Sequence, residues 1–136
     1  MSPAMTAPFG RVLTAMVTPF DADGAINVDA AAGLASHLVD HGHDGLVIFG
    51  TTGESPTVTP AEQEKVLRGV VEAVGQQASV VAGVGSYDTA SAVALTRTAS
   101  ACGADGVLAV TPYYNKPPQA GILAHFTAVA NASDVP

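Results

Sequence analysis

Four short apolar runs alternate with four helix-like segments along this chain of 136 residues, and they recur at intervals of about 30 residues, the usual size of a strand–helix unit. The apolar runs cover residues 11–18, 45–50, 79–85 and 106–111. Strands that are joined by helical crossovers pair in parallel within one sheet. The spacing therefore predicts an α/β fold built on a parallel sheet of four strands.

Two architectures fit this alternation, an open doubly wound sheet and a (β/α)8 TIM barrel. The open nucleotide-binding sheet is the weaker choice, because the glycines at 83 and 85 lack the third glycine of the dinucleotide fingerprint and no Walker A sequence occurs. A complete barrel needs about 250 residues. The length therefore predicts about the first four βα units of a (β/α)8 barrel, which is a half-barrel.

The segments between the runs carry helix start and stop signals. Thr59 and Glu62 have the spacing of a capping box around a proline. Either Asn27 or Asp29 can cap the first helix, and Asp88 is a plausible cap for the third. The expected helices cover approximately residues 27–41, 59–75, 88–103 and 119–130.

Composition excludes several classes of function. Acidic residues outnumber basic ones by 12 to 5, whereas a nucleic-acid binder normally carries a basic face. No apolar run approaches the roughly 20 residues of a membrane span, and no secretory signal is visible. A single cysteine, Cys102, fits a reducing compartment, and its context predicts a buried small side chain. We therefore expect a cytoplasmic protein that binds neither nucleic acid nor membrane, with a mobile N-terminus over residues 1–9.

Polar side chains follow the predicted strands at their carboxyl ends, where a barrel builds its active site. The segment 50–55, Gly-Thr-Thr-Gly-Glu-Ser, combines two hydroxyls with two glycines that let the backbone approach a ligand. An ordinary βα turn is the alternative. Tyr114 is the most suggestive acid–base candidate, although a packing or interface role fits it equally well. The full set is Thr18, Thr51, Thr52, Ser86, Tyr87, Thr111, Tyr113, Tyr114 and Asn115.

Two other kinds of site find little support. Metal binding is not expected, because the four histidines (His37, His41, His43 and His125) show no useful ligand spacing. A lysine inside an apolar strand would be desolvated and could act as a Schiff-base nucleophile. Lys65 and Lys116 both lie outside the predicted strands, so neither is expected to have this role.

Three segments together resemble the dihydrodipicolinate synthases, which belong to the pyruvate-dependent class I aldolase and lyase superfamily on the (β/α)8 barrel. They are residues 14–20 (Thr-Ala-Met-Val-Thr-Pro-Phe), 50–57 (Gly-Thr-Thr-Gly-Glu-Ser-Pro-Thr) and 110–117 (Val-Thr-Pro-Tyr-Tyr-Asn-Lys-Pro). They occur in the family's order, and the resemblance extends from Gly10 onward. The sialic acid branch usually has a serine in the first hydroxyl position, so the paired threonines favour the synthase.

The resemblance implies roles for three residues. Thr51 would sit in a proton relay, Thr52 would bind the pyruvate carboxylate, and Tyr114 would reach across a dimer interface to complete a neighbour's relay. The implied reaction condenses pyruvate with aspartate-4-semialdehyde through a lysine Schiff base, in lysine and diaminopimelate biosynthesis. The family commonly forms homotetramers of tight dimers and uses no dissociable cofactor.

The same resemblance places the relay tyrosine, the substrate-binding arginine and the Schiff-base lysine on strands five and six, beyond Pro136. Residues 10–136 are therefore expected to be the first half of a barrel, truncated before strand five and inactive alone. Two alternatives stay open. One is an N-acetylneuraminate or 2-keto-3-deoxy sugar-acid aldolase of the same superfamily. The other is a non-catalytic half-barrel that only assembles or binds small carboxylates, since an open sheet leaves edges that favour self-association.

Overall fold

A parallel sheet of four strands organises the computed structural model, which describes residues 7–136. The strands follow chain order across the sheet, β1-β2-β3-β4, as the alternation predicted. They are shorter than the apolar runs: β1 (Leu13–Ala15), β2 (Gly45–Ile48), β3 (Ser79–Gly83) and β4 (Gly106–Leu108). The predicted end of β2 at residue 50 was wrong because Phe49 turns to a φ of 57°, which a strand cannot accommodate.

Each strand is followed by a helix at the predicted place. The helices are α1 (Val28–Asp40), α2 (Pro60–Val74), α3 (Thr89–Ala101) and α4 (Gln119–Asn131). Asn27, and not Asp29, caps α1 by accepting from the Ala30 N–H, and the Thr59–Glu62 capping box is formed. A short 3-10 turn, η1 (Ser55–Thr57), lies between β2 and α2 and was not predicted.

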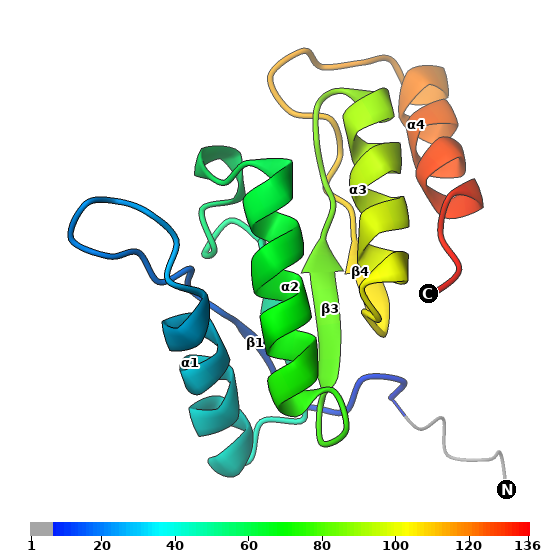
Figure 1. Ribbon diagram of the computed structural model, residues 1–136. Helices are drawn as coiled ribbons and strands as arrows, with labels where there is room; N and C mark the ends of the chain where they lie inside the picture. The colour runs from blue at the N-terminus through cyan, green and yellow to red at the C-terminus, as the bar shows by residue number, and fades with distance from the viewer. Residues whose placement is uncertain (1–6) are drawn as a thin grey trace, which may run out of the picture.

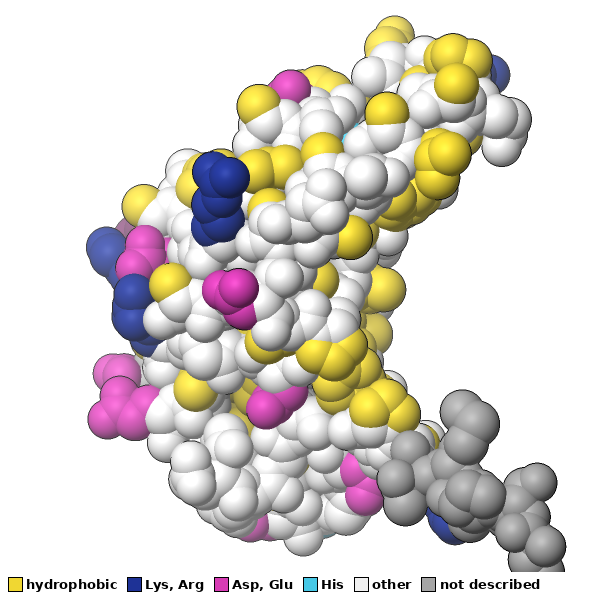
Figure 2. Space-filling model, turned by 90° about the vertical axis from the view of Figure 1, so that its right-hand side faces the viewer, with side chains coloured by type: hydrophobic (Ala, Val, Ile, Leu, Met, Phe, Trp, Pro, Cys, Tyr) yellow, Lys and Arg dark blue, Asp and Glu magenta, His cyan; other side chains and the backbone are white. Residues whose placement is uncertain are grey.

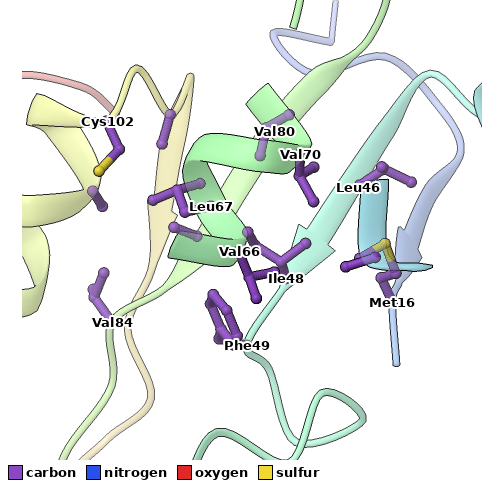
Figure 3. Packing of buried hydrophobic residues seen from close by; sticks show 14 of the residues in the cluster. Met16, Leu46, Ile48, Phe49, Val66, Leu67, Val70, Val80, Val84 and Cys102 are labelled. Carbon is purple, nitrogen blue, oxygen red and sulfur yellow. The ribbon is translucent and has the colours of Figure 1, made fainter. Parts of the chain in front are cut away.

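All the crossovers lie on one side of the sheet, so the helices form a single layer over it (Figure 1). Leu46 and Ile48 of β2, with Val80 of β3, point into that layer and are fully buried. Figure 3 shows them against Val66 and Val70 of α2. A doubly wound sheet would have helices on both faces and a reversal of strand order. The one-sided layer and the sequential order instead confirm the half-barrel.

The opposite side of the sheet, here called the inner face, is concave and apolar (Figure 2). Its side chains are those at the alternate strand positions that do not enter the helix-side core. At the edges of the sheet they remain exposed, with Val17 52%, Leu108 50% and Val110 52% accessible. The inner face comprises Leu13, Ala15, Val17, Val47, Val81, Leu108 and Val110.

Two aspartates fasten the amino ends of the strands. Asp44 Oδ2 accepts from the Arg11 and Val12 N–H groups, at 2.7 and 2.9 Å, and Asp105 Oδ2 accepts from the Val80 N–H at 2.8 Å. The predicted mobile N-terminus lies outside the described residues as far as residue 6. The next residues form a turn in which the Gly10 N–H donates to the Ala7 carbonyl at 3.1 Å.

Acid should reveal the contribution of Asp44. Hydrogen bonds from the Arg11 and Val12 N–H groups hold the pKa of this carboxyl below its ordinary value of 3.8. A lowered folded-state pKa stabilises the protein fully above the ordinary value, and this stabilisation is lost as pH falls through the lower one. We expect Asp44→Asn to be less stable than the parent at neutral pH, with the gap in melting temperature closing as the pH falls below 3.8. Thermal melts across this pH range test it, and a gap that stays constant would contradict it.

Candidate functional site

An open hollow of about 730 Å3 lies at the carboxyl ends of β2, β3 and β4. This is the end of the sheet at which barrel enzymes place their active sites. The segment after β2 forms one wall, through Gly50, Thr51 and Glu54. Leu108 and Val110 form another. The hollow is thus mostly apolar with a few polar groups at one side, which is the usual character of a small-molecule site.

The segment from Gly50 to Glu54 is held in an unusual backbone path. Phe49 directly precedes this segment and Glu54 ends it, and both are non-glycine residues at positive φ, 57° and 52°. Thr18 Oγ1 donates to the Gly53 carbonyl at 2.6 Å in a buried position. A Cβ atom placed on Gly53 would lie 3.0 Å from the Phe49 backbone nitrogen and 3.2 Å from the Met16 carbonyl oxygen, so a larger residue does not fit here. Non-glycine residues at positive φ are unfavourable and persist only where the surrounding structure enforces them, and they concentrate at functional sites.

The two predicted hydroxyl residues are both exposed, but only Thr51 lines the hollow. Neither hydroxyl has a hydrogen-bond partner among residues 7–136. The Thr51 carbonyl accepts from the Glu54 N–H at 3.1 Å, which fixes its backbone and leaves its side chain available. The structure thus presents Thr51 with a free hydroxyl beside a mostly apolar hollow, whereas the next residue, Thr52, is exposed and does not line the hollow.

The tyrosine pair after β4 separates into two environments. Tyr113 lines the hollow and packs edge-on against Tyr87, with ring centroids 5.4 Å apart. Asn115 Nδ2 donates to the Tyr87 carbonyl at 3.2 Å and ties the two loops together. Tyr114, in contrast, is 95% exposed at a φ of 68°. Within one chain the structure therefore brings Thr51 and Tyr113 to the hollow and directs Tyr114 away from it.

The remaining reactive side chains lie elsewhere. Lys65 on α2 and Lys116 in the loop after β4 are exposed, and neither lines the hollow. Burial raises the pKa of the Cys102 thiol at the end of α3, which disfavours the nucleophilic thiolate. In the described part of the chain, no three His, Cys, Asp or Glu side chains gather as a metal site would require.

Two polar contacts were missed from the sequence. Thr18 was expected only as one of several polar residues at strand ends, whereas it anchors the segment after β2. His125 of α4 is buried, and its Nδ1 pairs with Thr89 Oγ1 at 2.9 Å. The signal for Thr18 was its place in the alternation, because positions 16 and 18 continue the alternation beyond β1 and both side chains are buried.

One known protein family matches nearly the whole of the described chain. Residues 8–136 match the Dihydrodipicolinate synthetase family. The chain belongs to this family. Its fold is that of about half of the family's (β/α)8 barrel, because it spans between 42% and 46% of the length of the curated relatives that it matches.

Three members of the family illustrate the similarity. A curated relative from Acidothermus cellulolyticus, 4-hydroxy-tetrahydrodipicolinate synthase, is 65% identical over 96% of this chain and 42% of its own. The enzyme from Cyanidioschyzon merolae, crystallised with lysine bound, superposes with a TM-score of 0.91 at 48% identity, over 95% of this chain and 44% of that one. The chloride-inhibited enzyme from Acinetobacter baumannii, complexed with pyruvate, superposes with a TM-score of 0.89 at 35% identity, over 96% and 44%.

The sequence predicted no membrane-spanning segment, and the structure tests this for the helices. Among the helices described here, none combines the length and the apolar character needed to cross a bilayer.

Proposed function

We propose that this chain supplies the first half of a 4-hydroxy-tetrahydrodipicolinate synthase. Such an enzyme condenses pyruvate with aspartate-4-semialdehyde through a lysine Schiff base, in lysine and diaminopimelate biosynthesis. The observation that supports this most is the 65% identity to a relative of that name over nearly the whole chain. The free Thr51 hydroxyl beside an apolar hollow adds a chemical reason.

Three side chains of this chain have roles in the proposal. Thr51 passes a proton to and from the substrate, since the residue lines the hollow and its hydroxyl has no competing partner among the described residues. Thr52 binds the pyruvate carboxylate. Tyr114 completes the relay in a neighbouring copy, which agrees with its 95% exposure in an isolated chain.

The assembly proposed for the whole enzyme is a homotetramer of tight dimers in the cytoplasm. The lysine that forms the Schiff base belongs to the other half of the barrel, and no dissociable cofactor is required. Lys65 and Lys116 do not replace that lysine, because both are exposed to solvent and neither lines the hollow.

Borohydride trapping tests this division of labour. The 136-residue chain should show no added mass after incubation with pyruvate and borohydride. A chimera should instead trap pyruvate on a lysine of the relative's part and condense it with aspartate-4-semialdehyde. This chimera continues residue 136 directly into the remainder of the Acidothermus cellulolyticus relative. Intact-mass spectrometry followed by peptide mapping locates the adduct.

Two controls keep the outcome interpretable. The unmodified relative shows that the reagents work, and a Thr51→Val chimera should still trap pyruvate but turn over at least about 100-fold more slowly, because a proton-relay group is lost. An adduct on Lys65 or Lys116 of the short chain would overturn the proposal. A chimera that turns over N-acetylmannosamine or another sugar aldehyde in preference to the semialdehyde would identify a sugar-acid aldolase instead.

A further inference from the structure

The turn that carries Thr51 and Thr52 is held by a side chain from outside it. The Gly53 N–H donates to the Gly50 carbonyl at 3.1 Å, so these four residues form a β-turn in which the two threonines are central. Neither threonine hydroxyl has a hydrogen-bond partner in the described part of the chain. The placement of the two hydroxyls therefore depends on how the ends of the turn are fixed.

Thr18 fixes the far end of this turn. Its Oγ1 donates to the Gly53 carbonyl at 2.6 Å, and both residues are buried. In the part of the chain that the structure describes, the Gly53 carbonyl accepts no other hydrogen bond. A buried carbonyl has no water to replace a lost donor, so breaking this bond is unfavourable. The turn is thus anchored by a contact across 35 residues of sequence.

The backbone around Thr18 is itself held on both sides. Before it, the Met16 N–H donates to the Val47 carbonyl of β2 at 2.9 Å. After it, the Pro19 carbonyl accepts at 3.0 Å from the N–H of Asn27, the residue that caps α1. The proline ring also fixes the backbone φ directly after Thr18. Thr18 therefore donates from a position that the fold determines, as an anchor requires.

The bond lies inside this half of the barrel. Thr18 follows β1 and Gly53 follows β2, and these two strands are paired neighbours. Both residues are already buried by the described chain. The rest of a barrel is not needed to form this bond or to shield it from water.

We propose that Thr18 is a positioning residue for proton transfer by Thr51. Thr18 does not line the hollow, so it acts through the Gly53 carbonyl on the turn that carries Thr51. A displacement of about 1 Å in a reacting group can cost roughly 100-fold in rate. The inference rests on the proposed function, in which the Thr51 hydroxyl passes the proton.

Steady-state kinetics of the chimera described above test this role, with pyruvate and whichever aldehyde the unsubstituted chimera condenses fastest. Thr18→Val should lower kcat at least about tenfold, because the turn loses its anchor while the side chain keeps its shape. Thr18→Ser keeps the donor and should hold kcat within about threefold of the unsubstituted chimera.

A double variant separates positioning from a general loss of structure. In the Thr51→Val chimera the relay hydroxyl is already absent, so adding Thr18→Val should lower kcat by less than about threefold further. A residue that acted independently of Thr51 would instead lower kcat by its full factor again.

Val74→Ala is the matched control for lost stability. Val74 is 1% exposed and ends α2, just before β3 begins, so it lies at the end of the sheet opposite the hollow. Its truncation leaves a cavity and should lower the melting temperature. It should nevertheless leave kcat within about twofold of the unsubstituted chimera, at a temperature at which circular dichroism shows every variant folded.

Two kinetic results would overturn the inference. One is a Thr18→Val chimera whose kcat stays within threefold of the unsubstituted one, and the other is a double variant whose losses multiply. A chimera that prefers a sugar aldehyde would contradict the proposed substrate, but the ratios between variants would still decide the role of Thr18. If the unsubstituted chimera had no turnover, the proposed function would fail. Hydrogen exchange at the Gly53 N–H would then decide whether Thr18 holds the turn, and equal rates with and without Thr18→Val would contradict it.

Discussion

Replacing Gly83 by alanine should lower the free energy of unfolding by about 3 kcal/mol, since overpacking a tight core costs this much when the backbone must move. Gly83 ends β3, where it is buried against the segment after β2. A side-chain carbon there would lie 2.1 Å from the Phe49 oxygen and 2.6 Å from its carbonyl carbon. These are backbone atoms, so a rotamer change cannot relieve the overlap. Urea denaturation at one fixed protein concentration measures the loss.

Gly33→Ala is the matched control. Gly33 is an exposed residue of α1, and a side-chain carbon there meets nothing within 4 Å. Alanine should therefore stabilise the protein by about 0.8 kcal/mol, the helix-propensity difference from glycine. The same glycine-to-alanine change is thus expected to lower the free energy of unfolding at position 83 and to raise it at position 33. Equal effects would mean that Phe49 does not lie against β3 as described.

The Gly83 substitution should also reach the candidate site. Phe49 precedes the segment from Gly50 to Glu54, so a shift of the Phe49 carbonyl moves the wall of the hollow that carries Thr51. Hydrogen exchange at Gly53 and Glu54, whose N–H groups donate to the Gly50 and Thr51 carbonyls, should become faster in Gly83→Ala and stay unchanged in Gly33→Ala.

The helices could be predicted closely from the sequence because their signals are local. The Thr59–Glu62 capping box and the Asn27 cap each act within one turn, and both are formed. The ends of the strands could not be predicted in this way. Phenylalanine is rare at positive φ, and the Phe49 backbone lies against Gly83, a residue far along the chain, so that local sequence signals do not specify this conformation.

In the candidate site, too, local signals predicted some features, whereas others depend on contacts between distant residues. The position of Thr51 at the carboxyl end of β2 follows from the alternation, and the structure places it at the hollow. The separation of Tyr113 from Tyr114 depends on the Tyr87 ring and on a backbone turn at a φ of 68°, which no local pattern specifies. The roles of Thr51, Thr52 and Tyr114 stay predictions until activity is measured.

Replacing Thr18 by valine should cost about 2 kcal/mol of stability, because a buried carbonyl loses its donor while the shape of the side chain is kept. The Thr18 hydroxyl donates to the Gly53 carbonyl at 2.6 Å, across 35 residues of sequence. Valine offers no donor, and both groups are buried, so water cannot replace the bond without opening the structure. We also expect faster hydrogen exchange at Gly53 and Glu54.

Thr57→Val separates this effect from the loss of any threonine hydroxyl. Thr57 Oγ1 donates to the Glu54 carbonyl at 2.9 Å, in the same segment, but in an exposed position where water can take its place. Its replacement should therefore change stability by no more than about 0.5 kcal/mol. Thr18→Ser, which keeps the donor, should retain the slow exchange at Gly53. If Thr18→Val and Thr57→Val proved equally mild, Thr18 would not hold this segment in place. Its rigidity would then have to come from the crowding of Gly53 against Phe49 and Met16.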